Sequence, residues 1–355
     1  KETKLIDRSS FEFSNLKKID FQTGCQLEKI KKFAFRNLQI KEISIPDTVT
    51  SIGKQAFYNC SLLKKVNITP HSQLKIIKSN AFEKCGIESF VFPSTLETIK
   101  EFAFFECFNL AQIENYSNQI EFGYKSLARS GIEKIKFPSN SVFDDSSFKE
   151  CLKLKEIIFN GDVNKISFGS ESFAFTGLEN LEIENDSEVE IKANAFIFCR
   201  ELTKVVLTGK NILCDENSFS YCEGINEFSI TKISENNAKY NINYFNRMIK
   251  SINDSNVKKF SFTLVSTADD NSTHERKLII ENNCVVLDNK LIEANLINNI
   301  LPFKALPKSK LAKLLKSSEE IKKNEIIKVP SSVEKIELDS YIPHIKQIKW
   351  PSNCI

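Results

Sequence analysis

A strand-like run of the form Leu/Ile-x-x-apolar-x-apolar recurs along the chain at nearly constant intervals. Successive copies start 22 to 24 residues apart. This spacing is typical of repeat proteins, in which each unit buries its apolar face only against its neighbours. The sequence therefore predicts a solenoid of about ten repeats over residues 1–230. The ten copies begin at Leu16, Ile40, Leu63, Ile87, Leu110, Ile132, Leu154, Leu178, Leu202 and Ile225.

Between the strand-like runs, an apolar residue precedes a small-plus-aromatic pair by four positions. A four-residue step places both on one face of a single helical or 3₁₀ turn. With 29 phenylalanines in the chain, stacked aromatic residues are expected to fill the core. The clearest copies are Ile30 with Ala34-Phe35, Ile52 with Ala56-Phe57, Ile77 with Ala81-Phe82, Ile99 with Ala103-Phe104 and Ile191 with Ala195-Phe196.

These patterns together resemble the BspA-like class of leucine-rich repeats. Residues 46–68, PDTVTSIGKQAFYNCSLLKKVNI, carry every anchor of that repeat. The resemblance implies a leucine-rich-repeat solenoid, a curved right-handed coil with one short parallel strand per repeat. Irregular or 3₁₀ turns are expected on the opposite side.

The rhythm fails after Ile230. Residues 231–323 mix strand-like alternation with helical spacing over 235–252 and 308–324, so we expect divergent repeats or an α+β insertion there. Residues 324–355 recover the pattern through Pro330, Val333 and Ile336, which predicts resumed C-terminal repeats.

Six of the ten cysteines share one slot, three residues after the aromatic residue. In a stacked repeat such a slot becomes an internal column, and free cysteine behaves there as a small hydrophobic residue. No C-x-x-C pair or zinc-type Cys-His spacing occurs, so no metal or cofactor is expected. Disulfides between neighbouring slots remain an alternative, and Cys25, Cys284 and Cys354 lie outside the column. The six are Cys60, Cys85, Cys107, Cys151, Cys199 and Cys222.

No catalytic motif is present, and the three histidines are scattered, so an enzyme is not predicted. Only the divergent block, residues 231–323, could conceal an active site. No apolar run approaches the roughly 20 residues that span a bilayer, so this segment is not expected to insert into a membrane.

The outward positions of each strand, third and fifth in the run, are the candidate binding face. Positive and negative side chains cancel there, which argues against a nucleic-acid groove. Val91, Ile158 and Val206 are apolar points in this polar setting and favour a protein partner, although an ordinary solvated sheet is the alternative. The candidate residues are Lys65, Asn67, Ser89, Val91, Gln112, Glu114, Lys134, Lys136, Glu156, Ile158, Asn180, Glu182, Lys204 and Val206.

The BspA-like resemblance implies a surface antigen, at the cell surface or secreted, that adheres to a host protein, a matrix protein or another cell protein. The ten cysteines have no evident pairing scheme, and reducing cytosol suits such a set. An intracellular scaffold, cytosolic or cytoskeletal, is therefore the alternative function.

Overall fold

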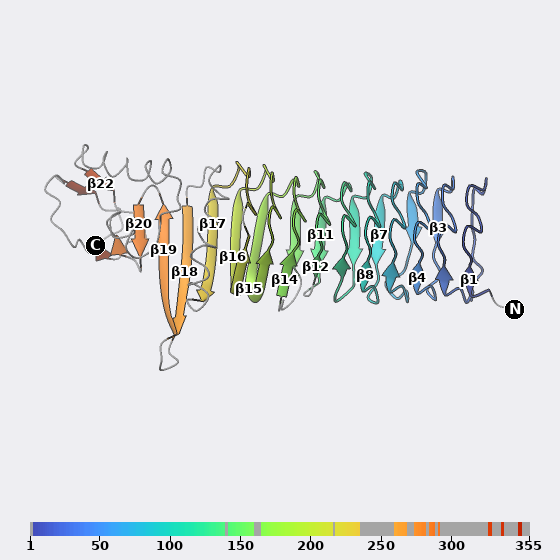
Figure 1. Cartoon of the computed structure of the whole chain (residues 1–355), viewed down its shortest axis with the longest axis horizontal. Coiled ribbons are helices and arrows are strands. Elements are labelled where there is room, and N and C mark those ends of the chain that lie inside the picture. Colours follow the sequence, from blue (N-terminus) through green and yellow to red (C-terminus); the bar gives the residue numbers. More distant parts are fainter. Residues whose placement is uncertain are drawn as a thin grey trace.

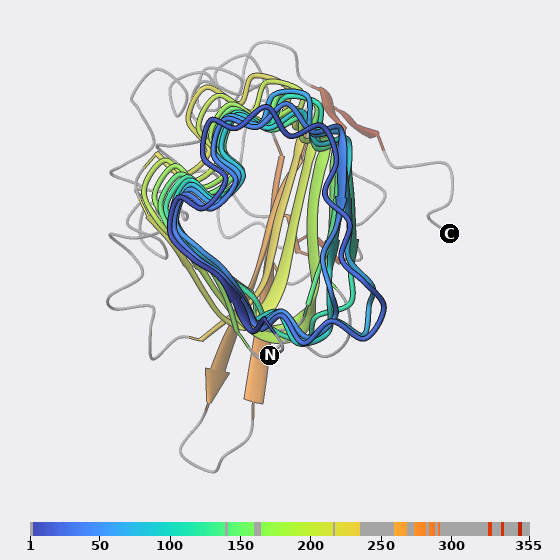
Figure 2. The ribbon, with the colours of Figure 1, turned by 90° about the vertical axis from the view of Figure 1, so that its right-hand side faces the viewer.

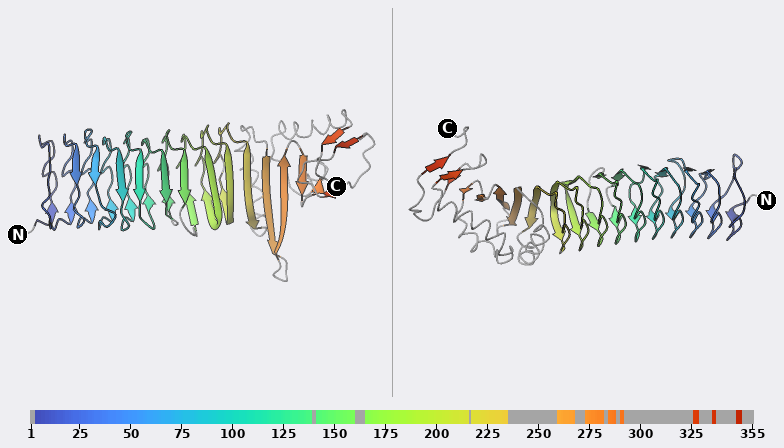
Figure 3. Two further views of the ribbon diagram at one scale, coloured as in Figure 1. Left: turned by 180° about the vertical axis from the view of Figure 1, so that it is seen from behind. Right: turned by 90° about the horizontal axis from the view of Figure 1, so that it is seen from above.

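The structure is a computed structural model that describes residues 3–138, 141–159, 165–215 and 217–234. It also describes strands at 259–267, 273–281, 284–287, 290–291, 326–328, 335–336 and 347–349. Successive coils stack along one axis from the N-terminal end, and no helix occurs in this part of the chain (Figure 1). Seen along that axis the coils superpose (Figure 2), and the views from behind and from above show them following one another without interruption from β1 to β17 (Figure 3).

A sixteen-stranded sheet, called the long sheet, runs the length of the stack. Its neighbours are parallel from the first strand through β17 and β18. In order, its strands are β1 (Leu5–Ile6), β2 (Lys29–Ile30), β4 (Ser51–Ile52), β6 (Ile76–Ile77), β8 (Thr98–Ile99), β10 (Glu121–Phe122), β12 (Val142–Phe143), β14 (Lys165–Phe168), β15 (Asn180–Ile191), β16 (Lys204–Cys214), β17 (Glu227–Ser234), β18 (Lys259–Thr267), β19 (Thr273–Glu281), β20 (Cys284–Leu287), β21 (Lys290–Leu291) and β23 (Lys335–Ile336).

A six-stranded parallel sheet, called the short sheet, forms from the predicted strand-like runs. The sequence predicts one strand per repeat, but coils in this region have two, because the short Val-x-x-Ile segment also pairs with its copies in the neighbouring coils. The strands of the short sheet are β3 (Glu42–Ser44), β5 (Lys65–Asn67), β7 (Ser89–Phe92), β9 (Gln112–Asn115), β11 (Lys134–Phe137) and β13 (Glu156–Phe159).

From β15 onward the two strands of a coil fuse into one longer strand within the long sheet. A register irregularity between Glu184 and Ser187 marks the place where they join. Beyond β18 the pairing becomes antiparallel through β19, β20 and β21, while β22 (Ile326–Lys328) and β24 (Gln347–Lys349) pair in parallel. The helical segments predicted at 235–252 and 308–324 lie outside the described residues, and the boundaries at 230 and 323 stay predictions.

The stack begins at β1, in the coil that also contains the run predicted to start at Leu16. β1 pairs in register with β2, and the Phe11 ring stacks on Phe35 at 5.5 Å between centroids. The run at Leu16, predicted as the first strand, forms no strand, although Ile19 packs partly buried against the core. β3 therefore forms one edge of the short sheet, because no strand lies before it to pair with.

Stacked phenylalanine rings fill the core as predicted. In the first half they form an unbroken column, Phe35–Phe57–Phe82–Phe104, with centroid separations of 5.1 to 5.2 Å. Leu127 interrupts this column. Offset stacking of this kind adds to the apolar burial that neighbouring coils provide.

The segment around each small-plus-aromatic pair, called the turn arc, is a series of tight turns. Two residues per coil have positive φ, one before the small residue and one two places after the aromatic, although they are not glycines. Backbone N–H groups of alternate residues donate to the next coil, as from Phe57 to Ala81 at 2.8 Å. These bonds offset the strain of the left-handed conformation. The positive-φ residues include Phe33, Asn37, Gln55, Asn59, Asn80, Lys84, Phe102, Glu106, Lys125, Arg129, Ser146, Glu150, Glu171, Phe175, Asn194, Phe198, Asn217 and Tyr221.

Candidate protein-binding face

Parallel pairing in register creates the candidate face. Lys65, Ser89 and Gln112 are direct partners on β5, β7 and β9, and the same row continues through Lys134 and Glu156. Because the side chains of a strand alternate between its two faces, the residues that alternate with these positions along each strand point into the core. Asn180 and Lys204 continue an equivalent row where the two strands of each coil have fused.

All fourteen predicted face residues lie on the outside of the sheets, and none is buried. Nine are exposed, and five are half-buried where neighbouring side chains cover them. The half-buried ones are Asn67, Val91, Ile158, Lys204 and Val206. The structure therefore places the predicted residues together on one continuous surface.

Opposite charges on this face pair between neighbouring coils. Lys134 lies 2.6 Å from Glu156, and Lys204 lies 2.9 Å from Glu182. In the adjacent row Lys155 lies 3.0 Å from Glu179, and the hydrogen bond to that carboxylate raises the pKa of Lys155. Exposed pairs of this kind stabilise a protein only slightly, by roughly 0–1 kcal/mol. They fix the positions of side chains that would otherwise be flexible.

An aromatic residue that the sequence pattern does not single out lies beside this face. Tyr116 follows β9 directly and is 47% exposed, and its hydroxyl donates to Glu114 at 3.1 Å. The same hydrogen bond raises the pKa of Tyr116. Its signal was a lone tyrosine just after a strand, and tyrosine is enriched at protein interfaces.

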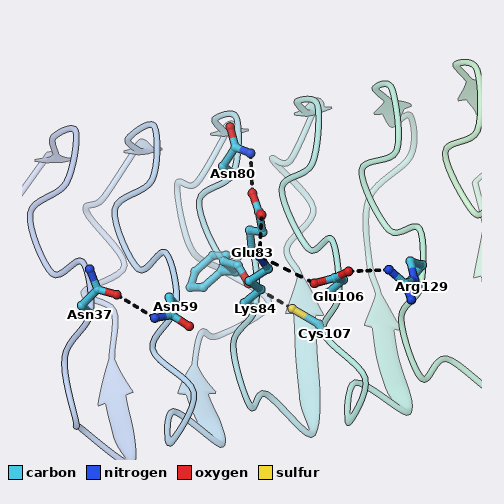
Figure 4. Close-up of polar contacts among 9 residues, drawn as sticks. Asn37, Asn59, Asn80, Glu83, Lys84, Glu106, Cys107 and Arg129 are labelled. Carbon is cyan, nitrogen blue, oxygen red and sulfur yellow. Dashed lines mark hydrogen bonds and ion pairs between the residues drawn. The ribbon is translucent and has the colours of Figure 1, made fainter.

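The turn arc carries a second ordered row, called the polar ladder. The side-chain amide of Asn59 donates to the side-chain oxygen of Asn37 at 2.7 Å. The Glu106 carboxylate lies 3.8 Å from the Lys84 ammonium and 2.5 Å from the Arg129 guanidinium (Figure 4). Arg129 continues to Glu150 at 3.4 Å. Nearer the C-terminal side the same positions hold stacked aromatic rings, with half-buried Phe198 between exposed Phe175 and Tyr221.

The cysteine slot is an internal column, as the sequence predicts. All six thiols are at most 3% exposed, and each donates to a carbonyl oxygen of the preceding coil. Ser130 and Thr176 fill the slot in two other coils and contact the next cysteine at 3.3 and 3.2 Å. The bonds run from Cys60 to Phe35, Cys85 to Phe57, Cys107 to Phe82, Cys151 to Leu127, Cys199 to Phe173 and Cys222 to Phe196, at 3.0 to 3.2 Å.

Burial makes two of these thiols, Cys107 and Cys151, unreactive. It raises the pKa of Cys107 to about 12 and that of Cys151 to about 11. Such groups remain protonated at neutral pH, whereas a nucleophilic or metal-binding cysteine needs the thiolate. The eight described cysteines are free, and Cys25 is the half-buried one among them. Cys284 lies in a strand described by its backbone, and Cys354 lies outside the described residues.

Metal-ligating side chains do not converge in the part of the chain that the structure describes. No group of three or more His, Cys, Asp and Glu residues lies close enough there to hold a metal ion. Within the same residues, no helix is long and apolar enough to cross a membrane. His274 lies on β19, where only the backbone is described.

Comparison with known families gives one match that covers most of the chain. The model of the BspA type leucine rich repeat region matches in six copies, over residues 1–85, 75–189 and 143–272. A comparison with curated protein sequences found no match.

Several solved structures are similar to the chain. A leucine-rich repeat protein from Bacteroides ovatus shares 21% identity, with 67% of this chain and 72% of that chain covered and a TM-score of 0.37. The pneumococcal vaccine antigen PcpA shares 22%, with 65% and 61% covered and a TM-score of 0.38. A leucine rich cell surface protein from Faecalibacterium prausnitzii shares 17%, with 57% and 83% covered and a TM-score of 0.28.

Proposed function

Because the chain belongs to the BspA-type leucine-rich repeat family, we propose that it is a non-enzymatic recognition module for a protein ligand. The ligand binds on the outer face formed by β5, β7, β9, β11, β13, β15 and β16. A cell-surface role in adhesion is part of this proposal and follows from the family type. The ligand is a host protein, a matrix protein or another cell protein.

The observation that carries the proposal is the ordered mixed character of this face. The Lys134–Glu156 pair, joined over 2.6 Å, stands beside half-buried Ile158. The Lys204–Glu182 pair, joined over 2.9 Å, stands beside half-buried Val206. Protein interfaces combine apolar anchors with a polar rim, and side chains that are already held in place lose less entropy on binding. Stacked coils supply such a surface without a pocket.

Substitutions at the centre of the face test the proposal. Lys136 is exposed and pairs in register with Ile158, so Lys136→Glu with Ile158→Asp places two repulsive or desolvated charges at adjacent points. We expect purified ligand, once identified by crosslinking to the wild-type protein, to bind this variant at least about tenfold more weakly. A control pair, Lys75→Glu with Lys153→Asp, makes similar changes at exposed positions away from the face. Equal binding by both variants would overturn the site assignment.

The free thiols favour a second candidate, an intracellular scaffold. Eight described cysteines carry no disulfide, and seven of them are buried. A reducing compartment keeps such thiols unpaired without protection. The test is the intact mass of protein from its own cells after thiol alkylation, with and without reductant. Ten alkylated cysteines and no glycan mass support the scaffold, whereas disulfides or glycans support the secretory route.

A further inference from the structure

Three basic residues stack at one position of the first three coils. β1, β2 and β4 pair in register through Ile6, Ile30 and Ile52, so the residues two places later, Arg8, Lys32 and Lys54, also correspond. Backbone hydrogen bonds confirm this correspondence: the Ser9 N–H donates to the Lys32 carbonyl oxygen and the Phe33 N–H to the Lys54 carbonyl oxygen, each at 3.1 Å. These coils lie at the N-terminal end of the stack (Figure 1). We call Arg8, Lys32 and Lys54 the cationic column.

Arg36 adds a fourth positive charge beside the column. The guanidinium of Arg8, the ammonium of Lys32 and the guanidinium of Arg36 lie 5.7, 4.4 and 5.2 Å from the centroid of one ring, that of Phe33. The three charges are therefore no farther apart than about one Debye length at 0.1 M salt, ~10 Å. Their mutual repulsion is only partly screened.

Nearby carboxylates neutralise this group incompletely. Glu12 pairs with Arg36 at 3.2 Å, while Asp7 pairs with Lys31, outside the column, at 3.2 Å. Among the described side chains, no carboxylate lies within ion-pair distance of Arg8, Lys32 or Lys54. Like charges stacked at one position of neighbouring coils repel each other. One charge row farther along the solenoid alternates in sign, through Lys84, Glu106, Arg129 and Glu150.

We propose that the cationic column with Arg36 binds a linear sulfated polysaccharide lying along the turn arc of the first three coils. Neighbouring coils are about 4.8 Å apart, so the column presents closely spaced cations in a straight line. That arrangement matches a polymer with fully ionised sulfate groups along its length, and Arg and Lys both form charge-assisted hydrogen bonds to such oxygens.

The same geometry disfavours a nucleic acid. Proteins that bind single strands offer aromatic rings on which bases stack. Here Lys32 and Arg36 lie against the ring of Phe33, and Arg36 also lies 5.8 Å from the ring centroid of exposed Phe13, so cations already border both rings. Positive and negative charges cancel on the strand face, so that face does not extend the basic surface beyond the first three coils. The site is separate from the candidate protein-binding face, and neither proposal depends on the other.

The probe is a heparin fragment, measured by titration calorimetry at several NaCl concentrations. Hyaluronan, which carries carboxylates without sulfates, and a single-stranded oligonucleotide serve as comparisons. We expect heparin to bind the wild-type protein and both comparison polymers to bind much more weakly. The variant Arg8→Gln, Lys32→Gln, Lys54→Gln should lose about tenfold or more in affinity, and its salt slope should fall by about one unit for each cation removed.

The control variant, Lys41→Gln, Lys75→Gln, Lys153→Gln, makes the same change in net charge at exposed lysines elsewhere. It should bind heparin nearly as the wild type does. Relieved repulsion should leave the column variant at least as stable as the wild type, and Lys32→Glu alone should also weaken binding. Equal losses in the column and control variants, no binding by the wild type, or oligonucleotide binding as tight as heparin would each overturn the proposal.

Discussion

Three buried serines in consecutive coils provide a direct test of the core. Ser126, Ser147 and Ser172 occupy the small position of the small-plus-aromatic pair, and each is fully buried. Their hydroxyl oxygens have no hydrogen-bond partner. Five other coils hold a fully buried alanine at this position, so a methyl group fits there without a void. These alanines are Ala34, Ala56, Ala81, Ala103 and Ala195.

Replacing the three serines with alanine should therefore stabilise the protein. An unpaired buried hydroxyl costs about 1–3 kcal/mol, so the lower limit for all three is about 3 kcal/mol of unfolding free energy. Neighbouring coils couple, so the three single variants must be measured with the triple variant. At about 2–4 °C for each kcal/mol, the midpoint should rise by roughly 6–12 °C.

Urea and thermal unfolding followed by circular dichroism measure this effect. The matched control is Ser218→Ala, because the Ser218 hydroxyl donates to the Asp215 carbonyl at 2.6 Å. Its removal should cost about 1 kcal/mol instead of gaining stability. A triple variant that unfolds at the same or a lower urea concentration than the wild type would refute the reasoning, since it would mean that the three hydroxyls are satisfied in solution.

Two further predictions concern the cysteine column and the spacing of coils. The folded pKa values of Cys107, about 12, and Cys151, about 11, exceed the ordinary value of 9.0. As pH rises, the unfolded chain releases these protons at a lower pH than the folded protein does. The free energy of unfolding should therefore fall between pH 9 and 11, by about 1.4 kcal/mol per pH unit for each thiol. Urea midpoints at pH 8 and 10 should show a smaller fall in Cys107→Ser, Cys151→Ser, and an equal fall would contradict this. A Cβ on Gly131 would lie 2.1 Å from the Phe108 carbonyl oxygen, whereas at Gly24, whose φ is +80°, it meets nothing within 4 Å and only backbone strain opposes it. Gly131→Ala should lower the unfolding free energy by about 3 kcal/mol, and Gly24→Ala by clearly less.

Repetition made most of the fold predictable from the sequence. Each structural position recurs about ten times along the chain, so the cysteine slot at Cys60 and the aromatic position at Phe57 can be told apart from the variable residues around them. Alternation along the strands then places Lys134 and Lys136 outside and Ile135 inside. Both inferences need only local periodicity.

The second strand of each coil could not be predicted in this way. A pair such as Ser51–Ile52 is too short to show a period, and it becomes a strand only because β2 and β6 flank it in register. The turn arc of the first coil was missed for a different reason. Its pair, Ser10-Phe11, keeps the four-residue offset from Ile6, but no alanine or cysteine accompanies it.

The turn arc had a signal that periodicity does not report. Its positive-φ positions hold Asn37, Asn59, Asn80, Asn194 and Asn217. Asparagine adopts the left-handed conformation more readily than most other non-glycine residues. Asparagine recurring two places before or two places after the aromatic residue was thus a sign of tight turns in place of a helical turn.

The order of charge signs along a row distinguishes rows that stabilise the fold from rows suited to bind a ligand of opposite charge. A solenoid brings together residues about 23 positions apart, so the net charge of +3 says nothing about any one row. The row from Lys84 to Glu150 alternates in charge sign, and its members form ion pairs with one another. Arg8, Lys32 and Lys54 repeat one sign at neighbouring coils, and in the described part of the fold only the contacts of Arg8 and Lys32 with the Phe33 ring offset their repulsion. An external anion removes the repulsion, which is why this column is the stronger candidate for a ligand of opposite charge.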